Sequence, residues 1–160
     1  MISIKPFDAN DAGQIADLLN PIIEDGTTTA LTGVITGADV LDWATNRKRP
    51  AWHVAVKEDG LVVGFQWINQ LNGHTREAAD IATFARIGHA GLGIGHKLFE
   101  TTEAAARDLG YTWINANIRE DNVSGLTYYN KIGFRDYDRI ENYALGDGRV
   151  VNKILKRFDL

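Results

Sequence analysis

The sequence predicts a single mixed α/β domain over residues 1–160, and three observations indicate this class. The chain has 160 residues, enough for one hydrophobic core and short for two. Strand-like and helix-like segments follow each other irregularly and include two hairpins, which favours a mixed sheet with flanking helices over a strictly alternating doubly wound fold. No repeat, linker or low-complexity tract interrupts this order.

The N-terminal half predicts strands and helices from the spacing of its apolar residues. Ile15, Leu18, Leu19 and Ile22 recur at helical spacing, and Pro50 ends a second helical pattern. The turn Glu58-Asp59-Gly60 separates two apolar runs and is typical of a hairpin. The expected elements are a strand over 2–7, helices over 8–23 and 36–49, and hairpin strands over 52–56 and 61–68.

The C-terminal half continues with alternating elements and a closing hairpin. Gly110 ends a helix that is striped by Ile94, Leu98 and Ala105. The turn Gly146-Asp147-Gly148 joins the last two strands. The expected elements are a strand over 76–87, a helix over 94–109, a strand over 111–118, a helix over 122–132, and strands over 134–145 and 150–158.

Composition narrows the class of partner. The net charge of −4 argues against nucleic acid and against an anionic membrane as the main partner. The chain contains no cysteine, which excludes disulfides, thiolate metal ligands and a cysteine nucleophile. The N-terminus has too short an apolar run for a signal peptide, and no segment approaches a membrane span, so we expect a cytoplasmic protein.

Four glycines between Gly88 and Gly95 form the most informative segment, Gly-His-Ala-Gly-Leu-Gly-Ile-Gly. Glycine lets the backbone approach a ligand closely, and a helix start adds free N–H groups and the positive end of the helix dipole, which suits a phosphate. A Walker A loop is excluded because Lys97 precedes Leu98 rather than Ser or Thr, and the dinucleotide fingerprint fits poorly. A merely tight strand-to-helix turn is the structural alternative.

A second motif follows one strand later, from Asn122 to Phe134. At 100° per residue Asn122, Gly125 and Tyr129 lie on one helical stripe. A glycine within a helix costs about 1 kcal/mol relative to alanine, so Gly125 indicates either close approach of a ligand or a crowded helix contact. Asn122 is also a good helix N-cap, and Tyr129 shares its face with apolar neighbours, so capping and core packing are the alternatives.

Together the two motifs resemble those of the GNAT superfamily of N-acetyltransferases. In that family a Gln/Arg-x-x-Gly-x-Gly/Ala loop holds the pyrophosphate of acetyl-CoA, and an Asn…Tyr…Gly-Phe helix motif follows. Residues 90–95 and 122–134 match in spacing and order, although Ala90 stands where the family has Gln or Arg. The segments at 20–29 and 80–85 look like those of the phosphinothricin N-acetyltransferase and amino-acid N-acyltransferase branch.

The resemblance implies a fold and a cofactor site. The fold is a mostly antiparallel sheet flanked by about four helices, in which the strands at 76–87 and 111–118 form a splayed parallel pair. Acetyl-CoA is the implied co-substrate, with its pantetheine arm along the strand at 83–85 and with the backbone N–H of Ala85 stabilising negative charge on the thioester oxygen. The implied cofactor residues are Thr83, Phe84, Ala85, Gly91, Leu92, Gly93, Ile94, Gly95, His96 and Asn122.

Direct transfer to an amine needs a base and an acid. Asp80 is our first candidate for the base, with a surface carboxylate as the structural alternative, and Glu24 is the second. Glu24 and Trp67 are also expected to line the substrate pocket. Tyr129 is the candidate acid for the departing thiolate. The four histidines show no metal-ligand spacing with supporting carboxylates, so no metal is expected.

The function predicted from the sequence is therefore transfer of an acetyl group from acetyl-CoA to a small primary amine, an amino acid or analogue. The alternatives are a peptide N-terminal or polyamine acetyltransferase, and a catalytically degenerate acyl-CoA-binding module. The C-terminal strands offer an exposed sheet edge, so a homodimer is also expected.

Overall fold

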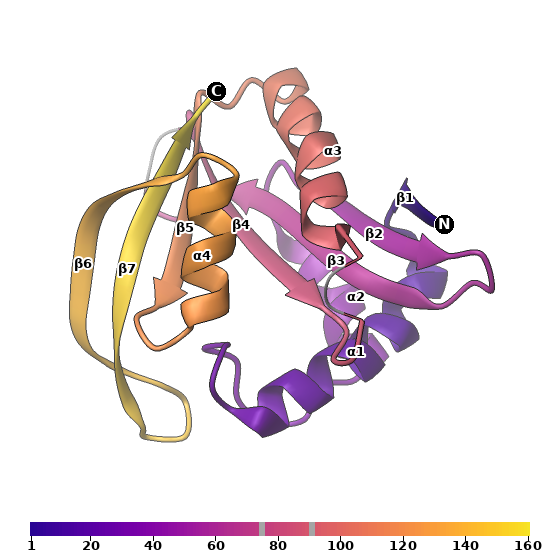
Figure 1. The fold of residues 1–160 in the computed structure, drawn as a ribbon, viewed down its shortest axis with the longest axis horizontal. Coiled ribbons are helices and arrows are strands. Elements are labelled where there is room, and N and C mark those ends of the chain that lie inside the picture. Colours follow the sequence, from indigo (N-terminus) through magenta and orange to yellow (C-terminus); the bar gives the residue numbers. More distant parts are fainter. Residues whose placement is uncertain (74–75, 90–91) are drawn as a thin grey trace.

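The computed structural model describes residues 1–73, 76–89 and 92–160. Every predicted strand and helix is found, with ends shifted by a few residues (Figure 1). The elements are β1 (Ile2–Pro6), η1 (Ala9–Asp11), α1 (Ala12–Asp25), α2 (Gly37–Asn46), β2 (Ala51–Lys57), β3 (Val62–Gln70), β4 (Ala78–Ala85), α3 (Ile94–Asp108), β5 (Trp113–Arg119), α4 (Val123–Lys131), β6 (Arg135–Ala144) and β7 (Val150–Asp159).

The strands form one sheet in the order β1-β2-β3-β4-β5-β7-β6. Neighbouring strands run antiparallel except β4 and β5, which are parallel. The pairing of β4 with β5 ends at Ile81–Ala116, and beyond it the two strands diverge (Figure 1). The expected splayed parallel pair is therefore confirmed, and it opens the sheet at its centre.

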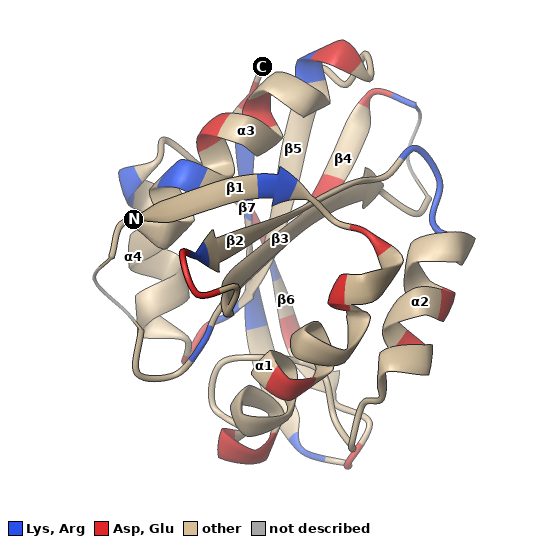
Figure 2. Ribbon diagram, turned by 90° about the vertical axis from the view of Figure 1, so that its right-hand side faces the viewer, with Lys and Arg blue, Asp and Glu red and all other residues tan. Residues whose placement is uncertain are grey.

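Helices cover both faces of the sheet, with α1 and α2 on one face and α3 and α4 on the other (Figures 1 and 2). On the first face, Ile15, Leu19 and Val40 pack against Trp52 and Phe65. The second face is packed by a different cluster, which includes Phe99, Ile114, Ile118, Tyr129 and Phe134. Each helix buries one apolar stripe, as the sequence periodicity predicted.

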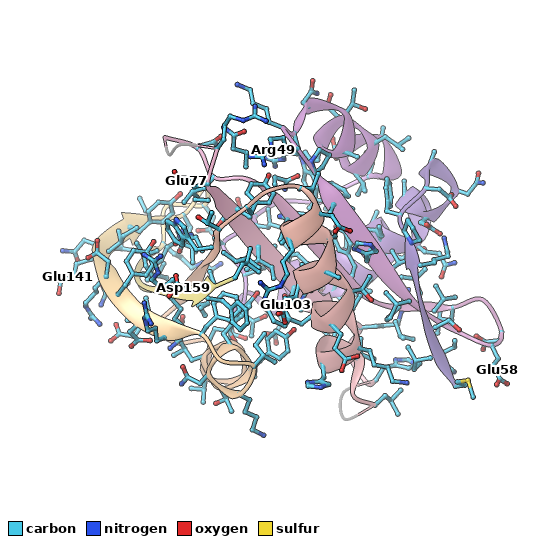
Figure 3. The ribbon with its side chains drawn as sticks, turned by 90° about the horizontal axis from the view of Figure 1, so that it is seen from above. Arg49, Glu58, Glu77, Glu103, Glu141 and Asp159 are labelled. Atoms are coloured by element: carbon cyan, nitrogen blue, oxygen red, sulfur yellow. The ribbon has the colours of Figure 1, made fainter. Side chains whose placement is uncertain are left out.

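Two features of the chain fix the helices to the sheet. Gly64 on β3 leaves room for Ile94 at the start of α3, since a Cβ at this glycine would collide with the Ile94 side chain. At the far end of α3 the guanidinium of Arg49 donates hydrogen bonds to the carbonyls of Arg76 and Leu109 and lies 4.2 Å from the centre of the Tyr111 ring (Figure 3). These contacts hold α3 across β3 and β4.

Charged residues of both signs are spread over many elements, with acidic positions on α1 and α2 (Figure 2). In the part of the chain that the structure describes, no helix is long and apolar enough to cross a membrane.

Candidate functional site

The divergence of β4 from β5 opens a cavity of about 400 Å³. Its wall comes from both halves of the chain, so no single stretch of sequence defines it. The lining residues are Thr28, Thr29, Ala30 and Leu31 after α1, Trp67 on β3, residues 80–84 on β4, residues 117–119 on β5, Asn122 and Tyr129 at α4, Tyr143 on β6 and Lys153 on β7. A cavity of this size suits a small molecule.

The free edge of β4 points into the gap left by β5. The N–H of Arg86 donates to the carbonyl of Val63 on β3 (2.8 Å). Because antiparallel pairs alternate between bonded and unbonded positions, Phe84 also bonds to β3, whereas Thr83 and Ala85 direct their N–H groups away from it. The predicted backbone donor at Ala85 therefore lies on an edge that can accept an extended ligand.

The start of α3 leaves its backbone donors without a side-chain cap. Gly93 is the N-cap residue in a left-handed conformation (φ 68°), and no side chain of the described residues accepts from the first turn. By contrast, Thr36 caps α2 and Asn122 caps α4. An uncapped helix start with its positive dipole end suits a phosphate, which would satisfy these N–H groups.

The predicted loop residues play different roles at this helix start. The side chain of Ile94 is buried in the core, so only its backbone can face a ligand, while Leu92 and Gly93 are exposed. His96 is exposed and lies 3.4 Å from Glu100, one helical turn on. Gly91, with Ala90 before it, lies outside the described residues.

Two tyrosines of α4 form hydrogen bonds with the start of α3 and with β4. The hydroxyl of Tyr128 donates to the carbonyl of Gly95 (2.7 Å), and its ring fills the space that a side chain at Gly95 would occupy. The hydroxyl of Tyr129 lies 2.8 Å from the Thr83 hydroxyl on β4. The two predicted motifs therefore meet in space, and Tyr128 joins them directly.

Gln66 on β3 connects the two tyrosines. Its side-chain amide donates to the hydroxyls of Thr83 (2.9 Å) and Tyr128 (3.1 Å), and its carbonyl oxygen is buried without a partner among the described residues. Burial raises the pKa of Tyr128 to about 12 and raises that of Tyr129 still further, so both phenols keep their protons at neutral pH.

Asp80 lies on β4 next to the point where the strands separate. Because Ala79 and Ile81 pack among the apolar residues under α3 and α4, Asp80 points to the opposite face of the sheet and into the cavity. Burial raises the pKa of its carboxyl above the ordinary aspartate value. The Asn115 amide donates to this carboxylate (2.9 Å) and, with Lys153 and Arg47, opposes the rise. A partly desolvated carboxylate of this kind can accept a proton from an amine.

The structure separates the two predicted substrate residues. Trp67 lines the cavity, where it stacks on Trp52 with ring centres 5.0 Å apart. Glu24 is exposed on α1 and is not among the cavity-lining residues, so the expectation that it reaches the pocket is corrected. The reason is helical phase, since the buried stripe of α1 runs through Leu18, Leu19 and Ile22 and turns Glu24 outward.

Asn122 caps α4 and also ties down the cavity wall. Its side-chain oxygen accepts from the N–H of Gly125 (2.9 Å), and its side-chain nitrogen donates to the carbonyl of Thr28 (3.0 Å). Both ends of the amide are engaged, so Asn122 supports the cavity wall. These contacts use one of the two N–H donors of its amide, so a contact with the cofactor stays a prediction. A Cβ at Gly125 would collide with this capping amide, which identifies the crowded contact as the reason for the glycine.

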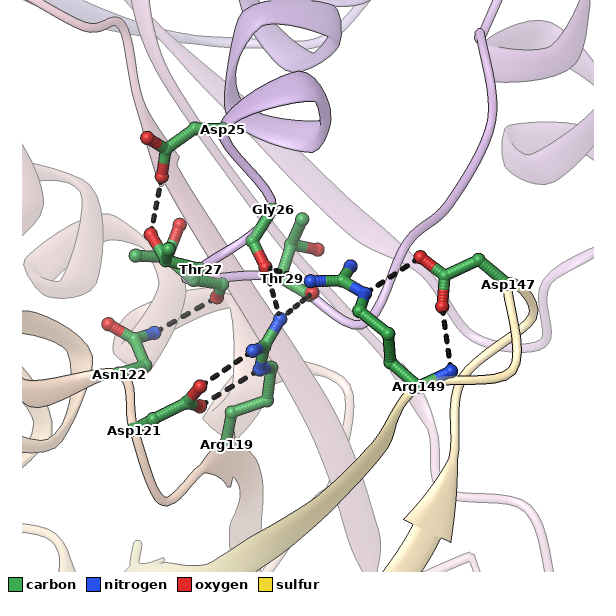
Figure 4. Close-up of polar contacts among 10 residues, drawn as sticks. Asp25, Gly26, Thr27, Thr29, Arg119, Asp121, Asn122, Asp147 and Arg149 are labelled. Carbon is green, nitrogen blue, oxygen red and sulfur yellow. Dashed lines mark hydrogen bonds and ion pairs between the residues drawn. The ribbon is translucent and has the colours of Figure 1, made fainter.

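Arg119 holds the loop after α1 against β5. The sequence did not predict this role. Its guanidinium donates to the carbonyls of Gly26 (2.8 Å) and Thr29 (3.0 Å) and forms a bidentate pair with Asp121 (Figure 4). Arg149 donates to the same Gly26 carbonyl (2.7 Å). Residues 26–31 are therefore a fixed wall of the cavity, and no local pattern around Arg119 indicates this.

Lys153 and Tyr143 also line the cavity and were not predicted. Lys153 is buried, and its ammonium lies 3.6 Å from the centre of the Tyr143 ring. Burial lowers the pKa of Lys153, while the Asp80 carboxylate opposes this shift. In the sequence, Val-Val-Asn-Lys-Ile-Leu-Lys-Arg shows no clear alternation, so a buried lysine could not be distinguished from an exposed one.

The predicted residues at the start of α3 are not among those that line this cavity, and the other cavity contains none of the predicted site residues. A second cavity of about 460 Å³ lies between β1, β2, α2 and the end of α3 and contains His53, whose pKa is lowered by burial. Within the described ranges, no group of three His, Asp or Glu residues is placed to hold a metal ion.

A family model described as the acetyltransferase (GNAT) family matches residues 22–134. A comparison with curated protein sequences found no match.

Solved structures share the fold across the whole chain at low sequence identity. A GNAT superfamily phosphinothricin acetyltransferase from Sinorhizobium meliloti, in complex with AcCoA, is 18% identical with a TM-score of 0.89, covering 99% of this chain and 88% of that one. A ribosomal-protein-alanine N-acetyltransferase from Brucella melitensis is 19% identical (TM-score 0.89; 99% of each chain). An N-acetyltransferase from Staphylococcus aureus Mu50 is 18% identical (TM-score 0.89; 99% of this chain, 98% of that one).

Proposed function

Because this chain belongs to the acetyltransferase (GNAT) family, we propose that it transfers the acetyl group of acetyl-CoA directly to the primary amine of a small substrate, an amino acid or analogue. The observation that carries the proposal is the cavity at the strand divergence, where the free edge of β4 and the Asp80 carboxylate meet. The complex of the Sinorhizobium meliloti acetyltransferase with AcCoA supports the choice of co-substrate.

The residues present fit acetyl-CoA at two places. The start of α3, which no described side chain caps, offers N–H groups and a positive dipole end for the pyrophosphate. Among the described residues, no atom lies within 4 Å of the position that a Cβ on Gly93 would take. The outward N–H groups of Thr83 and Ala85 suit the amides of the pantetheine arm. Acetyl-CoA supplies the activated acetyl group as a thioester.

Three groups of this chain do the chemical work. Asp80 accepts the proton that the acceptor ammonium must lose before its nitrogen can bond to the acetyl carbon. The N–H of Ala85 stabilises negative charge on the carbonyl oxygen. Tyr129 donates a hydrogen bond to the sulfur as the carbon–sulfur bond breaks, and the departing thiolate takes up the second proton, which the nitrogen releases as the amide forms.

The role of Tyr129 is constrained by its burial. Free thiols titrate near about 8.5, and burial raises the pKa of Tyr129 well above the ordinary tyrosine value. Complete proton transfer from this phenol to a thiolate is therefore steeply uphill. Hydrogen-bond donation from a fixed, protonated phenol stabilises the leaving sulfur without that cost.

The proposal is tested by measuring thiol release with acetyl-CoA and a panel of acceptors. The panel contains free amino acids, a peptide with a free N-terminus and a polyamine, and calorimetry with acetyl-CoA runs beside it. We expect binding of acetyl-CoA and turnover with amino acids. Turnover confined to the peptide or polyamine would overturn the substrate class, and binding without any turnover would indicate a degenerate acyl-CoA-binding module.

The proposal also covers the oligomeric state and the cellular compartment of the protein. We infer a homodimer through the exposed edge strand β6, and a cytoplasmic protein. Sedimentation velocity gives the oligomeric state, and a monomer at micromolar concentration would contradict the dimer.

A further inference from the structure

Lys153 is the one lysine among the residues that line the cavity. It is 7% exposed, yet the salt bridges within the described residues include none from its ammonium. The other buried lysine, Lys156, donates to Asn130 and Asp136. A buried ammonium costs free energy unless it is paired, so an unpaired one at a ligand cavity requires a reason.

Within the described ranges, no side chain forms a hydrogen bond or an ion pair with the Lys153 ammonium. Tyr143 offers a ring face 3.6 Å from the Lys153 ammonium, which is a cation–π contact and leaves the hydrogen-bond donors free. The neighbouring Arg119 adds a second positive charge, but Asp121 and two backbone carbonyls already engage its guanidinium. Lys153 therefore carries the cavity's available positive charge.

Asp80 and Lys153 mark two ends of the same cavity. On β5, Asn115 pairs with Asp80 and Arg119 pairs with Lys153, a separation of four residues or about 13 Å along the strand. Their charged groups interact electrostatically across the cavity, but they form no ion pair within 4 Å. Space between a carboxylate and an ammonium suits a ligand that carries the opposite charges.

We propose that Lys153 binds the carboxylate of the acceptor and thereby selects α-amino acids over simple amines. This inference rests on the proposed function, because it takes Asp80 as the site of the acceptor amine. An amino acid placed with its amine at Asp80 and its carboxylate at Lys153 neutralises both buried charges, whereas a monoamine leaves the ammonium of Lys153 unpaired. Lys153 is a specificity-determining residue and takes no part in bond making.

The test compares an amino acid, its amide and its decarboxylated amine, all with the same side chain, in the wild type and in Lys153→Met. Methionine keeps the length of the lysine and removes its charge. We expect the wild type to favour the acid over the amide at least tenfold in kcat/KM. In Lys153→Met the kcat/KM for the acid falls at least tenfold through KM, the amide changes at most a few-fold, and the KM for acetyl-CoA stays constant.

Controls separate this inference from the proposed function and from misfolding. Lys57→Met removes the same charge from the β2–β3 hairpin, where the Lys57 ammonium forms an ion pair with the exposed Asp59 (3.7 Å), and it should preserve the acid preference. Lys153→Arg should retain part of the preference, and thermal melting reports the fold of each variant. An unchanged acid-to-amide ratio in a folded Lys153→Met protein overturns the role of Lys153, whereas absence of turnover with every acceptor in the wild type overturns the proposed function.

Discussion

Asp80 and Tyr129 reach one cavity from opposite faces of the sheet. Asp80 alternates with apolar residues of β4 and points toward α1 and α2, while Tyr129 belongs to the cluster under α3 and α4. The divergence of β4 and β5 removes the backbone that would otherwise separate them. A base and a hydrogen-bond donor can therefore act on the two sides of the same reacting carbon.

At the residue scale, Tyr129→Phe tests the role of the phenol. We expect kcat to fall at least about tenfold because the leaving sulfur loses its hydrogen-bond donor, with the KM for acetyl-CoA within a few-fold of wild type. Steady-state kinetics measure both. Tyr128→Phe is the matched control, since it removes the bond to the Gly95 carbonyl and should cost about 1 kcal/mol of stability with little effect on kcat. Equal losses of kcat in the two variants would remove any special role for Tyr129.

Asp80→Asn separates catalysis from stability. We expect kcat/KM to fall by about 10²–10⁴ because the amine loses its base, and the acidic limb of the pH–rate profile should disappear. Burial raises the folded-state pKa of Asp80, so the unfolded chain binds fewer protons between the unfolded and folded pKa values. Wild-type stability from this group therefore declines as the pH rises through the folded-state pKa.

Urea unfolding of Asp80→Asn measures the predicted effect on stability. Since asparagine has no charge to desolvate, the free energy of unfolding above the folded-state pKa should equal or exceed that of the wild type. A large loss of stability in this pH range would show that the carboxylate is structural.

At the scale of elements, the helix starts are capped differently. Thr36 and Asn122 each accept a hydrogen bond from the first turn of their helix, at 3.2 Å and 2.9 Å. The start of α3 has no such cap, although it lies beside the strand divergence. The chain therefore caps α2 and α4 with its own side chains, whereas none of the described side chains caps α3.

Asn122→Ala and Thr36→Ala form a matched pair for this contrast. Each loses one N-cap, so we expect each to lower the free energy of unfolding by about 1 kcal/mol in urea titration. Only Asn122→Ala also breaks the bond to the Thr28 carbonyl in the cavity wall, so only this variant should raise the KM for the acceptor. An equal rise of the acceptor KM in Thr36→Ala would contradict the claim that Asn122 supports the cavity wall.

At the scale of the whole molecule, the acceptor cavity depends on contacts between distant parts of the chain. The loop after α1 is held by Arg119 on β5 and Arg149 at the start of β7 (Figure 4). Both arginines donate to the carbonyl of Gly26. This single carbonyl, directly after α1, therefore connects the N-terminal helix to the C-terminal strands.

Arg119→Lys tests this long-range anchor. Lysine keeps the charge but cannot bond at once to the two carbonyls and to Asp121, so we expect a loss of about 1–3 kcal/mol of stability and a raised acceptor KM. Binding of acetyl-CoA by calorimetry should stay within a few-fold. The control is Arg139→Lys, whose bidentate partner Glu120 is exposed, so this substitution should change the free energy of unfolding little. Equal effects of the two substitutions would contradict the anchor.

The sequence by itself determined the elements, their order and the candidate cofactor loop. Periodicity and turn residues report local physics, which is why the ends of most elements lie within a few residues of the prediction. Asp80, Tyr129 and Trp67, which the sequence singled out, all line the cavity, because position along β4, α4 and β3 follows from that local order.

Only the tertiary structure decided how the acceptor side is built. Glu24 turned outward with the phase of α1, and the expected N-cap Asn122 gained a second, long-range hydrogen bond to the Thr28 carbonyl. Arg119 and Lys153 became buried through sheet pairing and loop packing between segments far apart in the chain. Burial of a charged side chain depends on what folds over it, and this information is absent from its neighbours in sequence.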